Sequence, residues 1–190
     1  TVFVSDNSTN DETRALVEQI KDRRLVYRRT PRPTSMTGNL EFALAHCIEK
    51  ETCVTVIGDD DGLMPGGFSY ANDIFSEGGP DDVITWAAST YCWPNNLVES
   101  WKNKLKLSVS DELTRLDCAE MLKKLARCDV YYHHLPGLFT SLVPGSVIKK
   151  VLIRSGGKIL GISPDSASAV QIAAEIPEYF VVRDKIQVRP

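Results

Sequence analysis

The chain has 190 residues, 43% of them hydrophobic, which is enough to build the core of one compact domain. The net charge is -3 and the 22 Lys and Arg residues are scattered, so nucleic acid is not expected as a partner. Five cysteines without a Cys-x-x-Cys pair indicate reduced thiols in a cytosolic protein. No apolar run approaches the roughly 20 residues that cross a bilayer. We therefore expect membrane attachment, at the inner face, only through parts outside this chain.

The first part of the chain alternates predicted strands and helices. A β-rich run at 1–5 leads into turn formers and a helical pattern through Ile20. A second strand at 25–27 precedes a Pro-containing loop, and a helix is predicted over about 38–49. The apolar run CVTVIG at 53–58 is typical of a strand buried on both faces of a parallel sheet.

The second part is predicted to continue the alternation. The expected elements are a helix at 65–75, a strand at 82–88, a helix at 111–127 capped by Ser110 or Asp111, a strand or turn and short helix ending at Gly156 and Gly157, an extended segment at 158–162, and a helix from Ser163 to about Glu175. This order predicts an α/β fold with a Rossmann-like, mostly parallel sheet flanked by helices. We expect a single domain over residues 1–190.

An acidic run follows the apolar strand at 53–58. In an extended chain, Asp59 and Asp61 lie on one face and Asp60 points away. Two facing carboxylates repel each other unless a cation compensates, and Mg²⁺ or Mn²⁺ bound through carboxylates and substrate phosphates fits this pattern. An acidic turn without a metal remains the alternative, because Asp and Gly are common turn residues.

Two further acids are candidate site residues. Asp6 follows a predicted strand, and its alternative role is a helix cap or Asx-turn. Asp165 lies in the first turn of a predicted helix, where it either complements the helix dipole or acts as a general base. His133 and His134 are predicted to be mainly structural, because adjacent strand residues point to opposite faces.

Three aromatic residues of the less regular middle stretch, Tyr91, Trp93 and Trp101, have two interpretations. They could stack on a sugar or a base, but aromatic side chains in a domain of this size more often pack in the core or at its rim.

Several segments in order resemble the family-two glycosyltransferases, which have the GT-A fold. They are VSDNSTNDET, LVYRRTPRPTSMTGNLEFALAHCIE, VTVIGDDDGLMPGGF, ITWAASTYCWP, LPGLFTSLVPGSVI and GKILGISPDSASAVQIA. The resemblance divides the chain into a nucleotide-sugar-binding half, 1–90, and an acceptor-binding half, 91–190. It begins after the family's first strand, so we expect an excerpt of a longer protein. Gly145 and Phe139 replace a basic residue and a Tyr that are common in relatives.

The resemblance implies roles for six residues. Asp6 and Asn39 would lie at the nucleotide, Asp59, Asp60 and Asp61 would form the element that binds nucleotide and metal, and Asp165 would be the catalytic base. Asp61 would be the more direct ligand of Mg²⁺ or Mn²⁺, with Asp59 beside it.

The implied activity is inverting transfer of a sugar from a nucleoside diphosphate sugar, with a UDP-sugar favoured, to a glycan or lipid-linked acceptor. The alternatives are a sugar nucleotidyltransferase and a non-catalytic nucleotide- or glycan-binding domain. Nucleotide binding without product formation would distinguish the non-catalytic domain from the enzyme.

Overall fold

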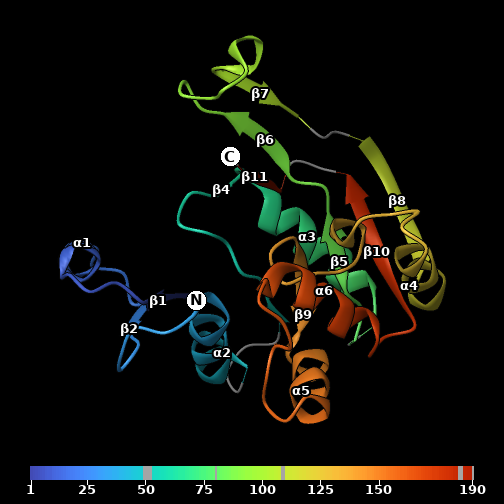
Figure 1. Cartoon of the computed structure of the whole chain (residues 1–190), viewed down its shortest axis with the longest axis horizontal. Helices are drawn as coiled ribbons and strands as arrows, with labels where there is room; N and C mark the ends of the chain where they lie inside the picture. The colour runs from blue at the N-terminus through green and yellow to red at the C-terminus, as the bar shows by residue number, and fades with distance from the viewer. Residues whose placement is uncertain (49–52, 80, 108–109, 184–185, 190) are drawn as a thin grey trace.

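A computed structural model of the chain describes residues 1–48, 53–79, 81–107, 110–183 and 186–189 (Figure 1). The N-terminal unit contains β1 (Val2–Asp6), α1 (Glu12–Gln19), β2 (Leu25–Arg29) and α2 (Met36–Cys47). The middle contains β3 (Cys53–Val54), β4 (Gly62–Leu63), α3 (Gly67–Glu77), β5 (Ile84–Trp86), β6 (Ser89–Cys92), η1 (Glu99–Trp101) and β7 (Lys104–Lys106). The rest contains β8 (Ser110–Asp117), α4 (Cys118–Ala126), η2 (Tyr132–His134), β9 (Ser141–Pro144), α5 (Gly145–Arg154), α6 (Pro164–Ala173), β10 (Glu178–Arg183) and β11 (Gln187–Arg189).

The N-terminal unit is a small βαβ arrangement, as the sequence predicted. β1 and β2 pair in parallel, with Val2 opposite Leu25 and Asp6 opposite Arg29. Helix α2 begins with Ser35, whose side chain accepts a hydrogen bond from the Gly38 N–H and so satisfies one free donor of the first turn. Because both strands end near the start of α2, polar residues at their carboxyl ends gather at one edge of the unit.

The main sheet among the described residues has five strands in the order β3-β9-β5-β10-β8. Only β5 and β10 pair in parallel, whereas the β3–β9, β9–β5 and β10–β8 pairs are antiparallel. A second sheet has the order β4-β11-β6-β7. The expected α/β fold with helices flanking the sheets is confirmed, but the pairing is mixed rather than mostly parallel. Antiparallel neighbours need no helical crossover, so the alternation of elements along the chain does not fix strand direction.

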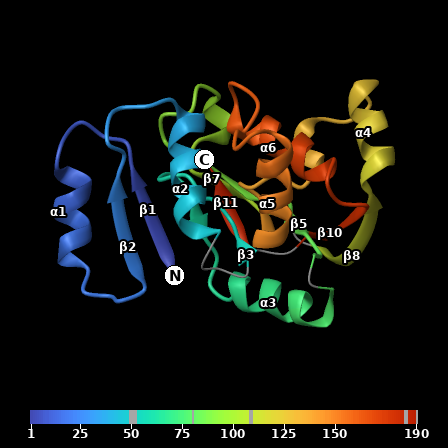
Figure 2. The same cartoon turned by 90° about the horizontal axis from the view of Figure 1, so that it is seen from below.

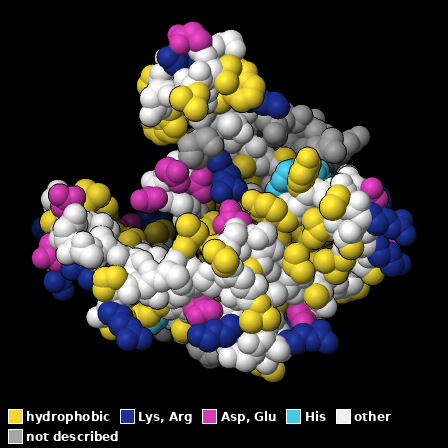
Figure 3. Space-filling model, in the orientation of Figure 1, with side chains coloured by type: hydrophobic (Ala, Val, Ile, Leu, Met, Phe, Trp, Pro, Cys, Tyr) yellow, Lys and Arg dark blue, Asp and Glu magenta, His cyan; other side chains and the backbone are white. Residues whose placement is uncertain are grey.

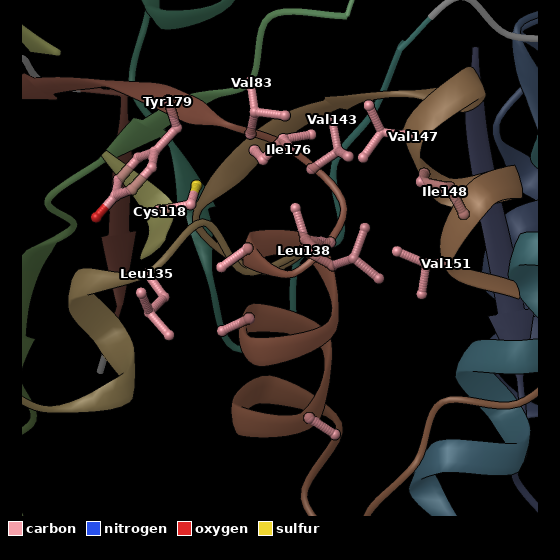
Figure 4. Packing of buried hydrophobic residues seen from close by; sticks show 14 of the residues in the cluster. Val83, Cys118, Leu135, Leu138, Val143, Val147, Ile148, Val151, Ile176 and Tyr179 are labelled. Carbon is pink, nitrogen blue, oxygen red and sulfur yellow. The ribbon is translucent and has the colours of Figure 1, made fainter. Parts of the chain in front are cut away.

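Helices cover both faces of the five-stranded sheet. Helices α4, α5 and α6 lie on one face and α3 on the other (Figure 2). The larger core cluster lies under α4, α5 and α6 and includes Leu138 and Tyr179 (Figure 4). A smaller cluster of Ala71, Trp86 and Ile186 packs on the α3 side. No helix in the described part of the chain is long and apolar enough to span a membrane.

Two predicted elements require correction. The helix expected over 111–127 begins only at Cys118, because its first half is strand β8, which pairs with β10 at the edge of the sheet. Its capping residue is Asp117, whose side chain accepts from the Glu120 N–H at 2.7 Å. The strand expected at 53–58 is reduced to β3, a partly exposed edge strand that pairs antiparallel with β9. Residues 158–162 form no strand.

Candidate functional site

The acidic run at 59–61 lies in a turn rather than in an extended chain. The Asp61 N–H donates to the Gly58 carbonyl at 3.3 Å, and the Gly58 N–H donates to Asp61 Oδ2 at 3.0 Å. Asp59 and Asp60 are exposed, whereas the Asp61 side chain is only 2% exposed. The expectation that Asp59 and Asp61 share one face of an extended segment is therefore wrong, because the turn gives their side chains different environments.

Strand β11 supplies the remaining partners of Asp61. The Gln187 Nε2 group donates to Asp61 Oδ2 at 2.9 Å, and Arg189 Nε lies 3.4 Å from Asp61 Oδ1. Gln187 is fully buried and accepts a hydrogen bond from the Trp86 indole Nε1–H at 2.9 Å. The Asp61 carboxylate is thus held in one orientation by groups from three separate segments of the chain.

Arg189 also connects this carboxylate with the predicted base. Arg189 Nη2 lies 3.7 Å from Asp165 Oδ2. Helix α6 begins at Pro164, and Asp165 lies in its first turn. The Asp165 side chain is 27% exposed. Ser163 occupies the cap position but makes no side-chain capping bond. The structure therefore brings Asp61 and Asp165 to one guanidinium group, with Asp61 at Nε and Asp165 at Nη2.

The carboxylate oxygens at this site are compatible with a divalent cation. Asp61 Oδ2 accepts two hydrogen bonds, whereas the contact of Oδ1 within the described residues is that with Arg189 at 3.4 Å. Among the described residues no group of three His, Cys, Asp or Glu side chains could hold a metal ion. Mg²⁺ commonly uses only one or two carboxylates and takes its other oxygens from phosphates and water. The residues present fit a cation that is bound together with a phosphate-bearing ligand.

Asp6 anchors the edge of the N-terminal unit. Its side chain is 2% exposed and accepts from the Tyr27 hydroxyl at 2.5 Å, the Ser8 N–H at 2.8 Å and Arg29 Nε at 3.1 Å. Burial raises the pKa of Asp6, but the hydrogen bonds from Tyr27, Ser8 and Arg29 outweigh it and hold the pKa below its usual range. Asp6 is therefore a charged, fully satisfied group, and its expected contact with a nucleotide stays a prediction.

Asn39 and Asn7 fix the elements around Asp6. Asn39 Oδ1 accepts from the Ser5 hydroxyl at 2.6 Å, which ties α2 to β1. The Asn7 side chain donates to the Thr34 carbonyl at 2.9 Å and accepts from the Thr34 N–H at 3.0 Å. These contacts give the loop before α2 one conformation. The predicted role of Asn39 beside a nucleotide is not tested by them.

A recess open to solvent lies between the N-terminal unit and the β6–β7 hairpin. In the space-filling view, acidic and basic side chains gather where this recess meets the helix-covered body (Figure 3). A separate hollow of about 460 Å³ opens between the start of α2 and residues 158–162, and its lining includes Thr37, Glu41 and Lys158. None of the six predicted site residues lines that second hollow.

The remaining candidates lie elsewhere. His133 and His134 belong to η2 rather than to a strand, and their exposed rings lie 4.5 Å apart. Tyr91 and Trp93 form an edge-to-face pair at 5.1 Å on the β6 side of the hairpin. Trp93 and Trp101 are about half exposed, so they contribute to the surface rather than to the core.

Sequence reasoning missed the residues that complete the site, namely Trp86, Gln187 and Arg189. Gln187 and Asp61 are 126 positions apart, and no local pattern connects them. The available signal was the Gln-x-Arg spacing, which places two polar side chains on one side of a short strand.

Comparisons with known proteins agree with this architecture. Residues 1–127 match the family model described as Glycosyl transferase family 2. No curated protein matches the chain.

Three similar solved structures are of the S. aureus protein TarS. TarS 1-349 is 14% identical with a TM-score of 0.68, and the match covers 99% of this chain and 50% of that one. A longer TarS structure is 15% identical with a TM-score of 0.70, covering 99% of this chain and 30% of that one. TarS 1-349 in complex with UDP is 13% identical with a TM-score of 0.64, covering 98% of this chain and 50% of that one. The chain thus spans about half or less of these proteins, and at this identity the likeness shows the fold.

Proposed function

Because the chain belongs to glycosyl transferase family 2, we propose that it transfers a sugar from a nucleoside diphosphate sugar to a glycan or lipid-linked acceptor, with inversion at the anomeric carbon. A UDP-sugar is the favoured donor, since a similar solved structure was determined with UDP. The observation that carries the proposal is the convergence of Asp61 and Asp165 on Arg189. A cytoplasmic site of action at the inner face of the membrane belongs to the same proposal.

The proposed mechanism gives each acid a separate task. Asp165 accepts the proton of the acceptor hydroxyl, whose oxygen forms a bond to the anomeric carbon while the bond to the nucleoside diphosphate breaks. Asp61, with Asp59 beside it in the turn, would hold Mg²⁺ or Mn²⁺ on the donor phosphates. The cation, when bound, would neutralise the charge of the departing diphosphate.

The N-terminal unit would hold the nucleotide. Asp6 and Asn39 lie at the edge where β1 ends and α2 begins, and Asp60 is exposed in the acidic turn. We expect Asp6 to act at the nucleotide by ordering this edge, because its carboxylate oxygens already accept hydrogen bonds from Ser8, Tyr27 and Arg29. Asn39 and Asp60 are the side chains that would approach the base and phosphates.

The proposal is tested by calorimetric titration of UDP, GDP and dTDP into the full-length protein, with Mn²⁺ and with chelator. We expect one nucleotide to bind with Mn²⁺ only, and Asp61→Ala to abolish this binding. Asp22→Asn is the matched control, because Asp22 is an exposed acid paired with Arg24 at 2.7 Å and precedes β2, whereas Asp6 lies opposite the last residue of β2.

A second measurement separates catalysis from binding. Asp165→Asn should bind the nucleotide as the unchanged protein does but release no nucleoside diphosphate from its sugar donor in the presence of acceptor. Full activity of Asp165→Asn would refute the assignment of the base. Binding without turnover in the unchanged protein would favour a non-catalytic module, and release of pyrophosphate from a nucleoside triphosphate would favour a nucleotidyltransferase.

A further inference from the structure

We propose that Gln187 and Arg189 are positioning residues with opposite effects on the cation site. Gln187, itself fixed by Trp86, would orient Asp61 for a divalent cation. Arg189 would occupy the place between Asp61 and Asp165 until the cation binds there. This inference rests on the proposed function and extends it to strand β11, which carries no predicted site residue.

Gln187 and Arg189 contact different oxygens of the Asp61 carboxylate. Side chains two apart on a strand point to the same side, and Gln187 and Arg189 both reach Asp61 from β11. Gln187 Nε2 donates to Oδ2 at 2.9 Å, where the Gly58 N–H also donates at 3.0 Å. In the part of the chain that the structure describes, Oδ1 is contacted by Arg189 alone, at 3.4 Å. The oxygen that is left for an incoming cation is therefore the one that faces the guanidinium.

The orientation of the Gln187 amide is fixed by chemistry. The Trp86 indole N–H can only donate, so it must face Gln187 Oε1, at 2.9 Å. The amide nitrogen then points at Asp61, where an ionised carboxylate can only accept. Trp86 is 2% exposed and Gln187 is fully buried, so water does not compete for these bonds. The chain from Trp86 to Asp61 thus sets the direction of the carboxylate before any ligand binds.

Arg189 is suited to leave when the cation arrives. Its side chain is 36% exposed, and its contacts of 3.4 and 3.7 Å to Asp61 and Asp165 are longer than a good charge-assisted hydrogen bond. A guanidinium at this place offsets the repulsion between two acids in the absence of metal. Arg189 can therefore move away from Asp61 and Asp165 without breaking a short bidentate salt bridge.

The test measures Mn²⁺ binding by electron paramagnetic resonance on the full-length protein, first alone and then with UDP. Trp86→Phe should weaken Mn²⁺ binding by about 10- to 100-fold, the usual effect of removing a partner that orients a metal ligand. Arg189→Gln should instead strengthen Mn²⁺ binding without UDP by about two- to fivefold, as for loss of a partly exposed competing ion pair. Gln187→Met should weaken Mn²⁺ binding to a similar extent, and it replaces Trp86→Phe in the test if Trp86→Phe does not fold.

Controls separate positioning from loss of structure. Arg154→Gln removes an exposed arginine from its 2.8 Å pair with Glu175 and should leave Mn²⁺ binding unchanged. Unfolding would weaken binding in every variant, so the opposite signs at Trp86 and Arg189 are specific.

Three outcomes are decisive. If Arg189→Gln and Trp86→Phe both behave like Arg154→Gln while Asp61→Asn abolishes Mn²⁺ binding, the positioning roles are wrong and the proposed function stands. If the two variants shift the affinity in the same direction, the opposed roles are wrong. If Asp61→Asn binds Mn²⁺ normally, the metal assignment in the proposed function fails, and this inference fails with it.

Discussion

Removing one hydroxyl, in Tyr179→Phe, should destabilise the fold by a predictable amount. Tyr179 is fully buried in the larger core cluster, and its hydroxyl donates to the His134 carbonyl at 2.5 Å (Figure 4). The variant removes this one hydrogen bond, and a hydrogen bond contributes about 0.5–1.5 kcal/mol net to stability. We expect a loss near the middle of that range, about 1 kcal/mol, because the Phe ring still fills the same space and the acceptor belongs to the exposed residue His134.

The assay is urea unfolding followed by tryptophan fluorescence, with a thermal melt as a second measurement. For a domain of this size, a loss of about 1 kcal/mol should lower the midpoint of the thermal melt by about 2–4 °C. Tyr91→Phe is the matched control. The Tyr91 hydroxyl is exposed and lies 3.4 Å from Asn103 Oδ1, so its removal should change stability by less than about 0.5 kcal/mol.

The pH dependence gives an independent check. Burial, and then the charge of Cys118, raise the pKa of Tyr179 above its usual value. A raised folded-state pKa gives stability that is fully present below the unfolded pKa of about 10 and is lost as pH rises through the folded value. The difference between Tyr179→Phe and the unchanged protein should therefore be constant from pH 6 to about 9 and shrink above pH 10. A loss below about 0.5 kcal/mol at pH 7 would refute the reasoning.

Further predictions concern a glycine, two thiols and an acid. Gly161→Ala should cost about 1–3 kcal/mol in urea unfolding, because its Cβ would meet the Ala167 Cβ at 2.8 Å. Iodoacetamide should label exposed Cys128 but not Cys118 in the native protein, since burial raises the pKa of the Cys118 thiol to about 12; equal labelling by mass spectrometry would contradict this. The stability that Asp6 contributes should be present above about pH 4 and lost as pH falls, because its folded pKa is depressed. The free energy of unfolding of Asp6→Asn should therefore fall less steeply with decreasing pH than that of the unchanged protein.

The sequence predicted most of the elements that carry the acids. Turn formers after β1, the prolines before α2 and the Ser-Pro-Asp start of α6 are local signals, and the structure has helices and strands at these places. The family match over residues 1–127 agrees with the resemblance stated from the motifs. Local chemistry therefore sufficed for the positions of Asp6, Asn39 and Asp165 in the fold.

Two features could not be predicted locally. Leu113 and Leu116 fit a helical spacing, yet they belong to β8, whose pairing with β10 overrides the local pattern. The Asp117 cap with Glu120 three positions later was the signal for the true helix start. The contacts of Gln187 with Asp61 depend on the pairing of β11 with distant strands, which only the whole fold determines.

The place of β11 in the chain has a consequence for synthesis on the ribosome. Asp61 leaves the exit tunnel 126 residues before Gln187, so at ordinary elongation rates it waits on the order of 10 s for this partner. During that interval the N-terminal unit can already form, because its strands and helices lie close together in sequence. The acidic turn acquires its fixed geometry only after β11 has been translated. A nascent chain arrested before β11 should therefore contain a folded N-terminal unit and an unfinished cation site.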